Sequence, residues 1–257
     1  AENIESAYKV SVLVTDAPES SRALELGKEY GIPVVAEDIR AFYRANGEER
    51  VSIRSPKAQE LRRLWSDSLR QKLSAYDIDF AIFAGFVPLT DLTADFPCLN
   101  VHPGDLTYLK DGQRFLIGLH SLPIELAILE GLSGLRSSVI LARPYSGSGE
   151  DMDNGPILGI STEVAIDLQK MRLSELQEIS QQRAEKRPIG GYKDKLAEIA
   201  AANLEALKIG GDWLLLPEVV EDFAKGRYAI NENQQLHYKM NEKFDPILTV
   251  VFDVKNR

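Results

Sequence analysis

The sequence predicts an α/β fold in which helices cover a mostly parallel, doubly wound sheet. Through the first half of the chain, short apolar runs alternate with longer helical patterns, the order expected of successive β-α-β units. One run, "DFAIFAGFV", is apolar at nearly every position, which is typical of a parallel strand buried on both faces. The chain has 257 residues, enough to form one large core, or one core with an appendage.

The first strand, helix and second strand are expected in residues 10–37. The alternating run "YKVSVLVTD" predicts a strand at about Val10–Val14, and "IPVVAED" predicts a second short strand. Between these runs, Pro18 suits the first turn of a helix and Gly31 suits a C-terminal cap. We therefore expect a helix from about Pro18 to about Gly31.

A second helix and two further strands follow. Ser55 is a preferred N-cap residue and Pro56 suits the first helical position, so a long helix is expected to begin here. The buried run "DIDFAIFAGFV" and the short run "PCLNVH" are then expected as strands. After them, "SLPIELAILEG" predicts a helix that Gly131 stops, and "RSSVILARPY" predicts another strand.

The C-terminal part of the chain is expected to be an appendage of helices and strands. The run "GPILGISTEVAI" is extended, and the segment at residues 193–228 predicts a helical hairpin. The runs "HYKMN" and "DPILTVVFDV" predict two closing strands. We therefore predict an α/β domain at residues 1–185, with residues 186–257 forming a helical hairpin and closing strands packed on the same domain.

Composition and charge exclude several functional classes. The net charge is −9 and no basic cluster is present, which disfavours nucleic-acid binding because contacts to phosphate dominate that affinity. No apolar run approaches the roughly 20 residues that a membrane helix needs, and no signal segment opens the chain. Cys98 is the single cysteine, so the chain has no internal disulfide. We expect a cytoplasmic protein with no nucleic-acid or membrane partner.

Three polar residues are expected to meet at one edge of the sheet. In "CLNVHPGDL", Asn100 and His102 end a strand, and in "MDNGPIL", Asp153 follows another strand. In open α/β sheets, sites lie outside the carboxyl ends of the strands. An amide and an imidazole can hold a carbonyl oxygen that gains negative charge, and a carboxylate can orient the imidazole or take up a proton through a water. The trio therefore suits transfer of an acyl group to an amine without a covalent intermediate.

The same residues also admit a structural interpretation. Asparagine and histidine at a strand end often satisfy their own turn, and only the "MDNGPI" loop favours a site. No "GxSxG" motif is present and Cys98 lies in an apolar strand, so the sequence offers no marked nucleophile. The histidines and the cysteine are scattered without the spacing of metal ligands, and "GSG" does not open a helix after a strand. We therefore expect neither a metal nor a nicotinamide cofactor.

"LNVHPGDL" and "MDNGPIL" together resemble the motifs of the folate-dependent formyltransferase family. That family has an N-x-H-P motif after a strand and an aspartate in a D-x-G-P-I type of loop. The resemblance runs in order from about Val10 to about Ile157, and more weakly to "FAKGRYAI". It implies a doubly wound sheet of the formyltransferase type and transfer of the formyl group of 10-formyltetrahydrofolate to an amine. The catalytic trio of the family maps onto Asn100, His102 and Asp153.

The resemblance also implies contacts to folate and to the amine. "AGFVPLT" resembles the segment whose backbone grips the pterin ring, and the loop at residues 143–152 would close the other side of that pocket. The residues expected to contact the folate are Phe86, Val87, Pro88, Leu89, Arg143 and Asp151. The residues expected on the side of the amine are His120, Ser138 and Gly104. Structural roles stay open for His120, which precedes a helix, for Ser138, which lies in a strand, and for Asp151, which suits a solvated loop.

The sequence departs from the family in three places. The family begins with a strand and a phosphate-binding loop, whereas the first strand here matches the second strand of the family, so we expect that an upstream strand is missing. Ile140 stands where transformylases of purine synthesis often carry a histidine. The polar segment "GDLTYLKDGQRFLIGLH" is longer than usual, and we expect it to reshape the side that receives the amine.

These features predict the class of the amine that accepts the formyl group, but they do not identify the compound. The tail is short and the chain acidic, which disfavours a transfer RNA acceptor and favours glycinamide ribonucleotide or a related small amine. Two alternatives remain: a hydrolase that releases formate from formyltetrahydrofolate, and a formyltransferase-like module that binds without catalysis. A homodimer is left open as the assembly.

Overall fold

The computed structural model describes residues 6–86, 88–143, 152–188 and 190–253. The chain divides into two compact units. We call Ala1–Asn100 with Leu141–Gly155 the N unit, and Val101–Ile140 with Pro156–Arg257 the C unit. The predicted boundary between residues 185 and 186 stays a prediction.

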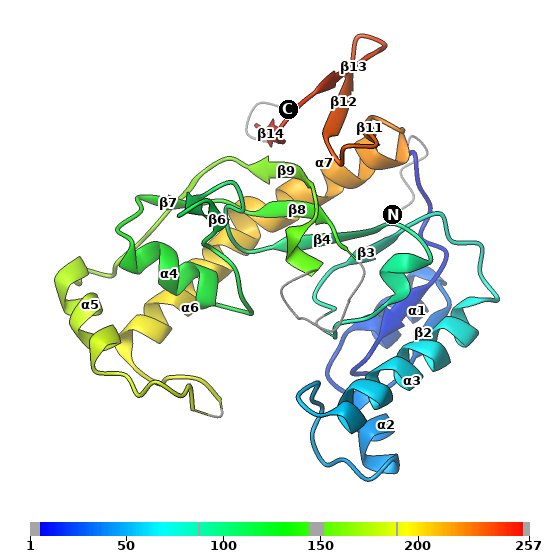
Figure 1. The fold of residues 1–257 in the computed structure, drawn as a ribbon, viewed down its shortest axis with the longest axis horizontal. Helices are drawn as coiled ribbons and strands as arrows, with labels where there is room; N and C mark the ends of the chain where they lie inside the picture. The colour runs from blue at the N-terminus through cyan, green and yellow to red at the C-terminus, as the bar shows by residue number, and fades with distance from the viewer. Residues whose placement is uncertain (1–5, 87, 144–151, 189, 254–257) are drawn as a thin grey trace. The chain divides into compact units, whose positions relative to one another are not determined.

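Helices and short strands alternate along the N unit, as expected (Figure 1). Its elements in chain order are β1 (Leu13–Thr15), α1 (Ala23–Tyr30), β2 (Val34–Ala36), α2 (Ile39–Ala45), α3 (Pro56–Leu73), β3 (Ala81–Phe83), the 3-10 turn η1 (Leu92–Ala94), the start of β4 (Cys98–His102) and the 3-10 turn η2 (Met152–Asn154).

The core of the N unit forms around α3. The predicted start of this helix is confirmed, because the Ser55 hydroxyl accepts a hydrogen bond from the backbone N–H of Ala58 at 3.2 Å. The buried face of α3 carries Trp65 and Leu69, which share one hydrophobic cluster with Tyr43 of α2 and residues of β1 and β2. The cluster fixes α3 against the strands that precede it.

Helix α1 begins later than predicted. It starts at Ala23 rather than near Pro18, because residues 17–22 form turns: the backbone N–H of Ser21 bonds to the carbonyl of Ala17, and the Ser21 hydroxyl lies 2.7 Å from that of Thr15. The predicted end is confirmed, since Gly31 has the left-handed φ of 66° that suits a glycine cap.

The strands of the N unit form two parallel pairs. β1 pairs with β2, and β3 pairs with β4 so that Phe83 lies opposite Asn100. The "DFAIFAGFV" strand is shorter than expected, because Gly85 adopts a φ of 77° and turns the chain just after β3. In the part of the chain that the structure describes, β1 pairs only with β2, and β3 pairs only with β4.

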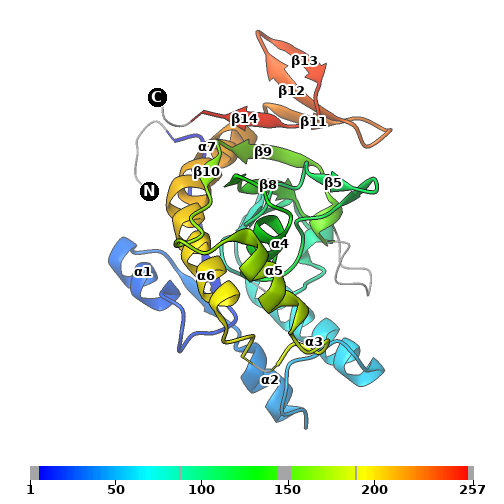
Figure 2. The same ribbon diagram turned by 90° about the vertical axis from the view of Figure 1, so that its left-hand side faces the viewer.

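The C unit holds most of the helices and the closing strands (Figure 2). Its elements in chain order are the end of β4, β5 (Leu109–Lys110), β6 (Gln113–Arg114), α4 (Leu122–Leu129), β7 (Gly134–Leu135), β8 (Ser138–Leu141), β9 (Ile157–Ser161), β10 (Val164–Ala165), α5 (Leu173–Gln181), α6 (Lys195–Leu207), the π-turn η3 (Lys208–Asp212), α7 (Trp213–Ala224), β11 (Tyr228–Ile230), β12 (Leu236–Met240), β13 (Lys243–Pro246) and β14 (Val250–Phe252).

Strands β14, β9, β8, β4 and β3 form one sheet in that order. β9 pairs in parallel with β14 and antiparallel with β8, and β3 pairs in parallel with β4. A sheet of this kind covered by helices confirms the predicted α/β class with its mostly parallel sheet. The C-terminal part adds the antiparallel sheet β11–β12–β13, so the predicted appendage of helices and strands is present.

The core of the C unit joins α4, α5 and α6 in one hydrophobic cluster. Ile124 and Ile128 of α4 and Ile199 of α6 are fully or almost fully buried in it. α4 carries almost no polar face, which fits a helix that neighbouring elements cover on several sides. Among the described residues, no helix combines the length and the apolar character needed to cross a bilayer.

The predicted helical hairpin is instead one continuous helical run. α6 passes through η3 into α7 without a reversal, and the residues at both junctions, Leu207 and Trp213, keep right-handed helical angles (Figure 1). Gly210 and Gly211 signal a turn in the sequence, but neither adopts a positive φ. Their lack of a side chain serves close packing, because a Cβ on Gly210 would lie 3.0 Å from Val164 and one on Gly211 would lie 2.9 Å from Leu207.

Candidate functional site

Two residues of the predicted trio contact each other in the N unit. Asn100 lies on β4, Asp153 lies in η2, and the Asn100 amide Nδ2 donates to the Asp153 carboxylate Oδ1 over 3.5 Å. This is a long hydrogen bond, and both side chains are partly buried. The carboxylate from "MDNGPIL" therefore reaches the asparagine of "CLNVHPGDL", as the order of the motifs predicts.

Gly155 lets the chain that follows η2 pass close to the backbone of Leu141. A Cβ at this position would overlap the carbonyl oxygen of Leu141, and it would lie 2.9 Å from the carbonyl carbon of the same residue. Nearby, the backbone N–H of Ala142 donates to the carbonyl of Cys98 at 2.8 Å, which ties this segment to β4. Only glycine lets the chain pass this close. Gly155 directly follows η2, so the close passage holds η2, and Asp153 in it, near Asn100.

His102 lies two residues after Asn100 on β4, and alternate residues of a strand point to the same face. The ring is 3% exposed, and its Nε2 lies 2.7 Å from the carbonyl oxygen of Leu116. A carbonyl can only accept, so Nε2 carries a hydrogen and Nδ1 is the nitrogen that gains or loses a proton. His102 can therefore donate through Nδ1 only when the ring is protonated.

Gly104 and Ser138 have structural roles around His102 in the C unit. A Cβ on Gly104 would lie 2.6 Å from the Leu116 oxygen and 3.1 Å from His102 Nε2, so glycine leaves the space in which these two atoms bond. The buried Ser138 hydroxyl donates to the Gly104 carbonyl at 2.7 Å and accepts from the Leu106 N–H at 3.0 Å. These bonds hold the loop after His102, so the alternative structural role kept for Ser138 is present, and its contact with a substrate stays a prediction.

The segment expected to bind folate packs onto the core of the N unit. The Phe86 ring stacks on Trp65 and Phe83, with centroid distances of 6.1 and 5.5 Å, and the Leu89 carbonyl accepts from the buried Arg62 guanidinium at 2.9 Å. Pro88 is partly exposed. Val87 lies outside the described residues, and the folate contacts of this segment stay predictions.

The remaining predicted contact residues are exposed or undescribed. Arg143 is exposed close to Gly155, with its Cγ 3.7 Å from where a Cβ of that glycine would lie. His120 is exposed and has a left-handed φ of 57° two residues before α4 begins. Asp151 lies outside the described residues. Roles in binding stay predictions for all three residues.

Cys98 is unsuited to covalent catalysis. Its side chain is fully buried in β4, and burial raises the pKa of the thiol to about 12. A thiol with so high a pKa is almost never a thiolate near neutral pH. Among the described residues, no group of His, Cys, Asp or Glu side chains is arranged to hold a metal ion.

Sequence reasoning missed a partly buried carboxylate in the C unit. Asp212 ends η3, and its Oδ1 accepts a very short hydrogen bond from the hydroxyl of the buried Ser137. Burial raises the pKa of Asp212, while the Ser137 hydrogen bond and the positive charges of Lys208 and His102 lower it. The run "KIGGDW" carried a signal for it, because two glycines before an aspartate inside a helical pattern indicate close packing at that aspartate.

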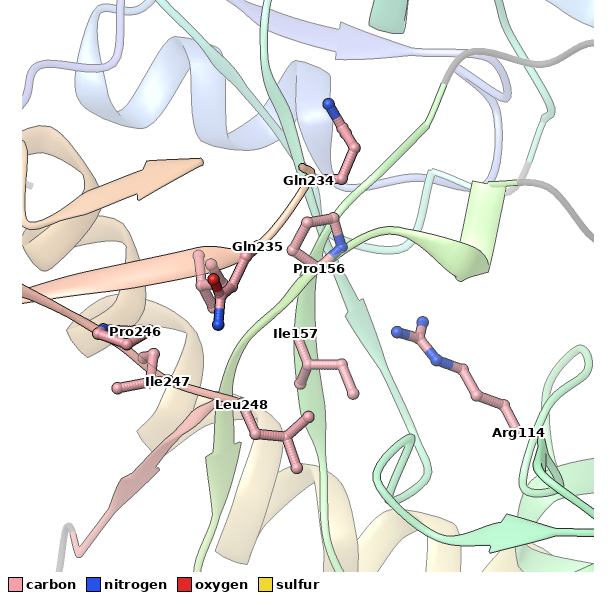
Figure 3. A pocket seen from close by; sticks show the side chains of 9 residues that line it. Arg114, Pro156, Ile157, Gln234, Gln235, Pro246, Ile247 and Leu248 are labelled. Atoms are coloured by element: carbon pink, nitrogen blue, oxygen red, sulfur yellow. The ribbon is translucent and has the colours of Figure 1, made fainter. Parts of the chain in front are cut away.

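A hollow of about 510 Å³ lies elsewhere in the C unit (Figure 3). In this view the Arg114 guanidinium extends toward the start of β9, where Ile157 lies. The full lining is Arg114, Pro156, Ile157, Gln234, Gln235, Leu236, Pro246, Ile247 and Leu248. None of the residues expected to act in catalysis or binding belongs to it.

Comparison with solved structures identifies the fold. No protein-family model matches the sequence, and no curated protein matches it. The phosphoribosylglycinamide formyltransferase of Coxiella burnetii is 16% identical, with a TM-score of 0.56 over 97% of this chain and 88% of that one. The corresponding enzyme of Anaplasma phagocytophilum is 15% identical, with a TM-score of 0.53 over 97% of this chain and 89% of that one. A formyltetrahydrofolate deformylase of Burkholderia mallei is 13% identical, with a TM-score of 0.47 over 89% of this chain and 59% of that one.

The first two similarities span almost the whole chain. They show that this chain has the fold of the formyltransferases, as the sequence motifs predict. The similarity shows the fold alone, so the reaction must be argued from the side chains on β4 and in η2.

Proposed function

We propose that this chain transfers the formyl group of 10-formyltetrahydrofolate to an amine. The contact between Asn100 and Asp153 carries the proposal, because it joins the two motifs whose order suggested the reaction. The fold adds support, since two solved phosphoribosylglycinamide formyltransferases share it. His102, on the same strand as Asn100, supplies the third group.

The reaction needs an oxygen to be stabilised and protons to be moved. The amine nitrogen attacks the formyl carbon, a C–N bond forms, and the carbonyl electron pair moves onto the oxygen. The bond between the formyl carbon and N10 of the folate then breaks, and N10 takes a proton while the amine loses one. The products are a formamide and tetrahydrofolate, with no group left on the protein.

Each residue of the trio has a role that its geometry suits. Asn100 has two amide hydrogens, so one can bond Asp153 while the other donates to the developing oxyanion. Protonated His102 donates its Nδ1–H to the same oxygen, because Nε2 is held by Leu116. Asp153 receives the amine proton through a water.

We propose glycinamide ribonucleotide or a related small amine as the acceptor. Two solved structures with this fold are named as formyltransferases of that compound, which supports the class of acceptor. Two features depart from the family pattern: Ile140, and the segment that contains the β5–β6 hairpin. That segment also supplies Leu116, whose carbonyl lies beside His102. Turnover assays with different small amines therefore decide which of them is the acceptor.

The test measures turnover of 10-formyltetrahydrofolate with a panel of amines that includes glycinamide ribonucleotide. In Asp153→Asn we expect kcat/KM to fall at least about 100-fold, the usual scale for loss of a general acid–base group. Asp79→Asn, which neutralises an exposed carboxylate of the N unit, serves as the matched control and should stay near wild type. Unchanged turnover in Asp153→Asn would contradict the proposal.

The same assay separates the two alternatives. Release of formate without any amine, at a rate that amines do not raise, would identify a hydrolase. Folate binding without turnover under any condition would identify a binding module. Formylated product with one amine of the panel supports the transferase and names its acceptor.

A further inference from the structure

The hollow drawn in Figure 3 has an apolar wall that the fold of the C unit holds in place. Ile157 and Leu236, the first residues of β9 and β12, form the buried base of this wall and are 5% and 4% exposed. The backbone N–H of Ile247 donates to the Leu236 carbonyl at 2.9 Å, which ties the segment after β13 to β12. The wall is therefore formed before any ligand arrives, as is usual for sites that bind small molecules.

The rim of the hollow exposes an unusual amount of apolar surface. Leu248 is 76% exposed, more than any other large apolar residue that the structure describes. A single exposed leucine is common on protein surfaces, but this one lines a concavity together with Ile247, Pro246 and Pro156. The volume of about 510 Å³ lies within the roughly 300–1,000 Å³ that small-molecule sites usually have. Apolar surface gathered around a hollow of this size favours a small ligand with an apolar body.

Arg114 gives the hollow a positive charge. Of the nine described residues that line it, Arg114 on β6 is the single charged one, so no carboxylate belongs to this lining. Asp245 is next to the lining residue Pro246 on β13, and its carboxylate lies 3.7 Å from the Lys243 ammonium. In a chain with a net charge of −9, a hollow with a cation and no carboxylate favours an anionic ligand.

We propose that this hollow binds an organic anion that joins an apolar body to one carboxylate. The body packs against Ile157, Ile247 and Leu248. The carboxylate accepts hydrogen bonds from the Arg114 guanidinium, whose planar fork of donors matches the two carboxylate oxygens. A carboxylate suits the hollow better than a phosphate monoester, because a phosphate carries nearly two negative charges and the lining supplies one cation. The site does not depend on the function proposed above.

Calorimetric titration of the full chain with octanoate and four related compounds tests this choice of ligand. 1-Octanol lacks the charge, acetate lacks the apolar body, octylammonium reverses the charge, and octyl phosphate replaces the carboxylate. We expect octanoate to bind at least about 10-fold more tightly than each of them, the scale of one hydrogen bond to a charged group. A Kd for octanoate above about 10 mM, or binding of 1-octanol as tight as that of octanoate, would overturn the proposal. Tighter binding of octyl phosphate would overturn the choice of a carboxylate.

Substitution of Arg114 tests the role of its charge. Arg114→Gln should weaken the binding of octanoate at least about 10-fold and leave that of 1-octanol unchanged. Arg187→Gln removes the same charge from an exposed position of the C unit outside the lining, and it should bind octanoate as wild type does. Arg114→Glu should bind octylammonium in place of octanoate, a gain that a misfolded variant cannot show. Equal losses in Arg114→Gln and Arg187→Gln contradict the role of Arg114.

NMR of labelled isoleucine methyl groups shows where octanoate binds. The signals of Ile157 and Ile247 are assigned from Ile157→Val and Ile247→Val, and both should shift as octanoate is added. The signal of Ile128, buried in α4 and outside the lining, should stay in place. Shifts confined to isoleucines outside the hollow would show that octanoate binds elsewhere and would overturn the proposal.

Discussion

At the scale of single residues, the absence of a side chain matters as much as its presence. Gly155 lets η2 pass the Leu141 carbonyl, and Gly104 leaves room for the bond between His102 and Leu116. In both places a backbone carbonyl occupies the space that a Cβ would take. A carbonyl in the backbone cannot swing aside as a flexible side chain does, so these two positions are sensitive to the smallest substitution.

Gly155→Ala should separate Asp153 from Asn100. The added methyl group overlaps the Leu141 carbonyl, so η2 must move, and we expect the free energy of unfolding to fall by about 1–3 kcal/mol. Urea denaturation measures this loss, and turnover should fall with it. Asn154→Ala, at the exposed neighbouring position, is the control. Equal stability and turnover in Gly155→Ala and Asn154→Ala would show that η2 is not seated by this contact.

The sequence predicted only part of the residue-scale arrangement. Asn100 and Asp153 were expected to meet because both follow strand ends, and side chains at such ends share one edge of the sheet. The partner of His102 is a backbone carbonyl, that of Leu116, and a carbonyl has no signature in the sequence. Asp212 was missed because residues 193–228 were interpreted as a helical hairpin, and a hairpin gives no reason to place this residue beside Ser137.

At the scale of elements, the start of α6 shows how one carboxylate serves two partners. Asp194 caps the helix by accepting from the N–H of Ala197 at 2.9 Å, and it pairs with Arg183 through two hydrogen bonds of 2.8 Å. The Arg183 side chain is 10% exposed and also bonds the buried Glu125 of α4. The cap of α6 is thereby tied to α4.

Asp194→Asn should weaken this tie and keep the cap, since asparagine caps helices as well as aspartate. Hydrogen bonds from Arg183 hold the pKa of Asp194 below its usual value of 3.8, so the carboxylate stabilises the fold above that pH. The stabilisation is lost as the pH falls through the lowered pKa. We expect a loss of about 1–2 kcal/mol at pH 7, measured by urea denaturation, and a smaller loss at pH 3.5.

Glu198→Gln gives the comparison for that prediction. It removes a carboxylate from the same helix, where Glu198 is 65% exposed beside Lys195, and should cost less than about 0.5 kcal/mol. A loss in Asp194→Asn that stays constant between pH 7 and pH 3.5 would contradict the electrostatic explanation.

Element boundaries were predictable where a local chemical signal was strong. Ser55 with Pro56, and Gly31 with its left-handed φ, marked a helix start and a helix end correctly. Pro18 misled because the bonds of Ser21 to Thr15 and Ala17 favour turns there. Helix α5 was not predicted: Arg172 is not a preferred N-cap residue, although Glu175 accepts from its backbone N–H at 2.8 Å.

At the scale of the whole molecule, the order of strands and helices was enough to predict the fold class. Parallel pairing in β1–β2, β3–β4 and β9–β14 follows from an alternating pattern, because parallel neighbours need a crossover between them. The sequence could not show that β1 and β2 form a sheet of their own, because the pattern of one strand says little about which distant strand lies beside it.

Net charge makes a prediction at this scale. With 39 acidic and 30 basic residues, the chain should repel a polyanion, so we expect no saturable binding of transfer RNA below about 10 µM in 0.15 M salt. Filter binding against a known RNA-binding protein measures this. Tight binding that weakens steeply as the salt concentration rises would contradict this prediction and make transfer RNA a candidate acceptor again.

The turn between α6 and α7 also determines which side of α7 faces the core. Buried positions recur every four residues at Asn203, Leu207, Gly211, Leu215 and Val219, whereas each such step overshoots one turn of an α-helix by about 40°. Four steps would carry Val219 nearly to the far side of the helix. The surplus residue of the π-turn takes back about 100° of that drift. One extra residue thus lets a single helical run keep the same side against the core along its whole length.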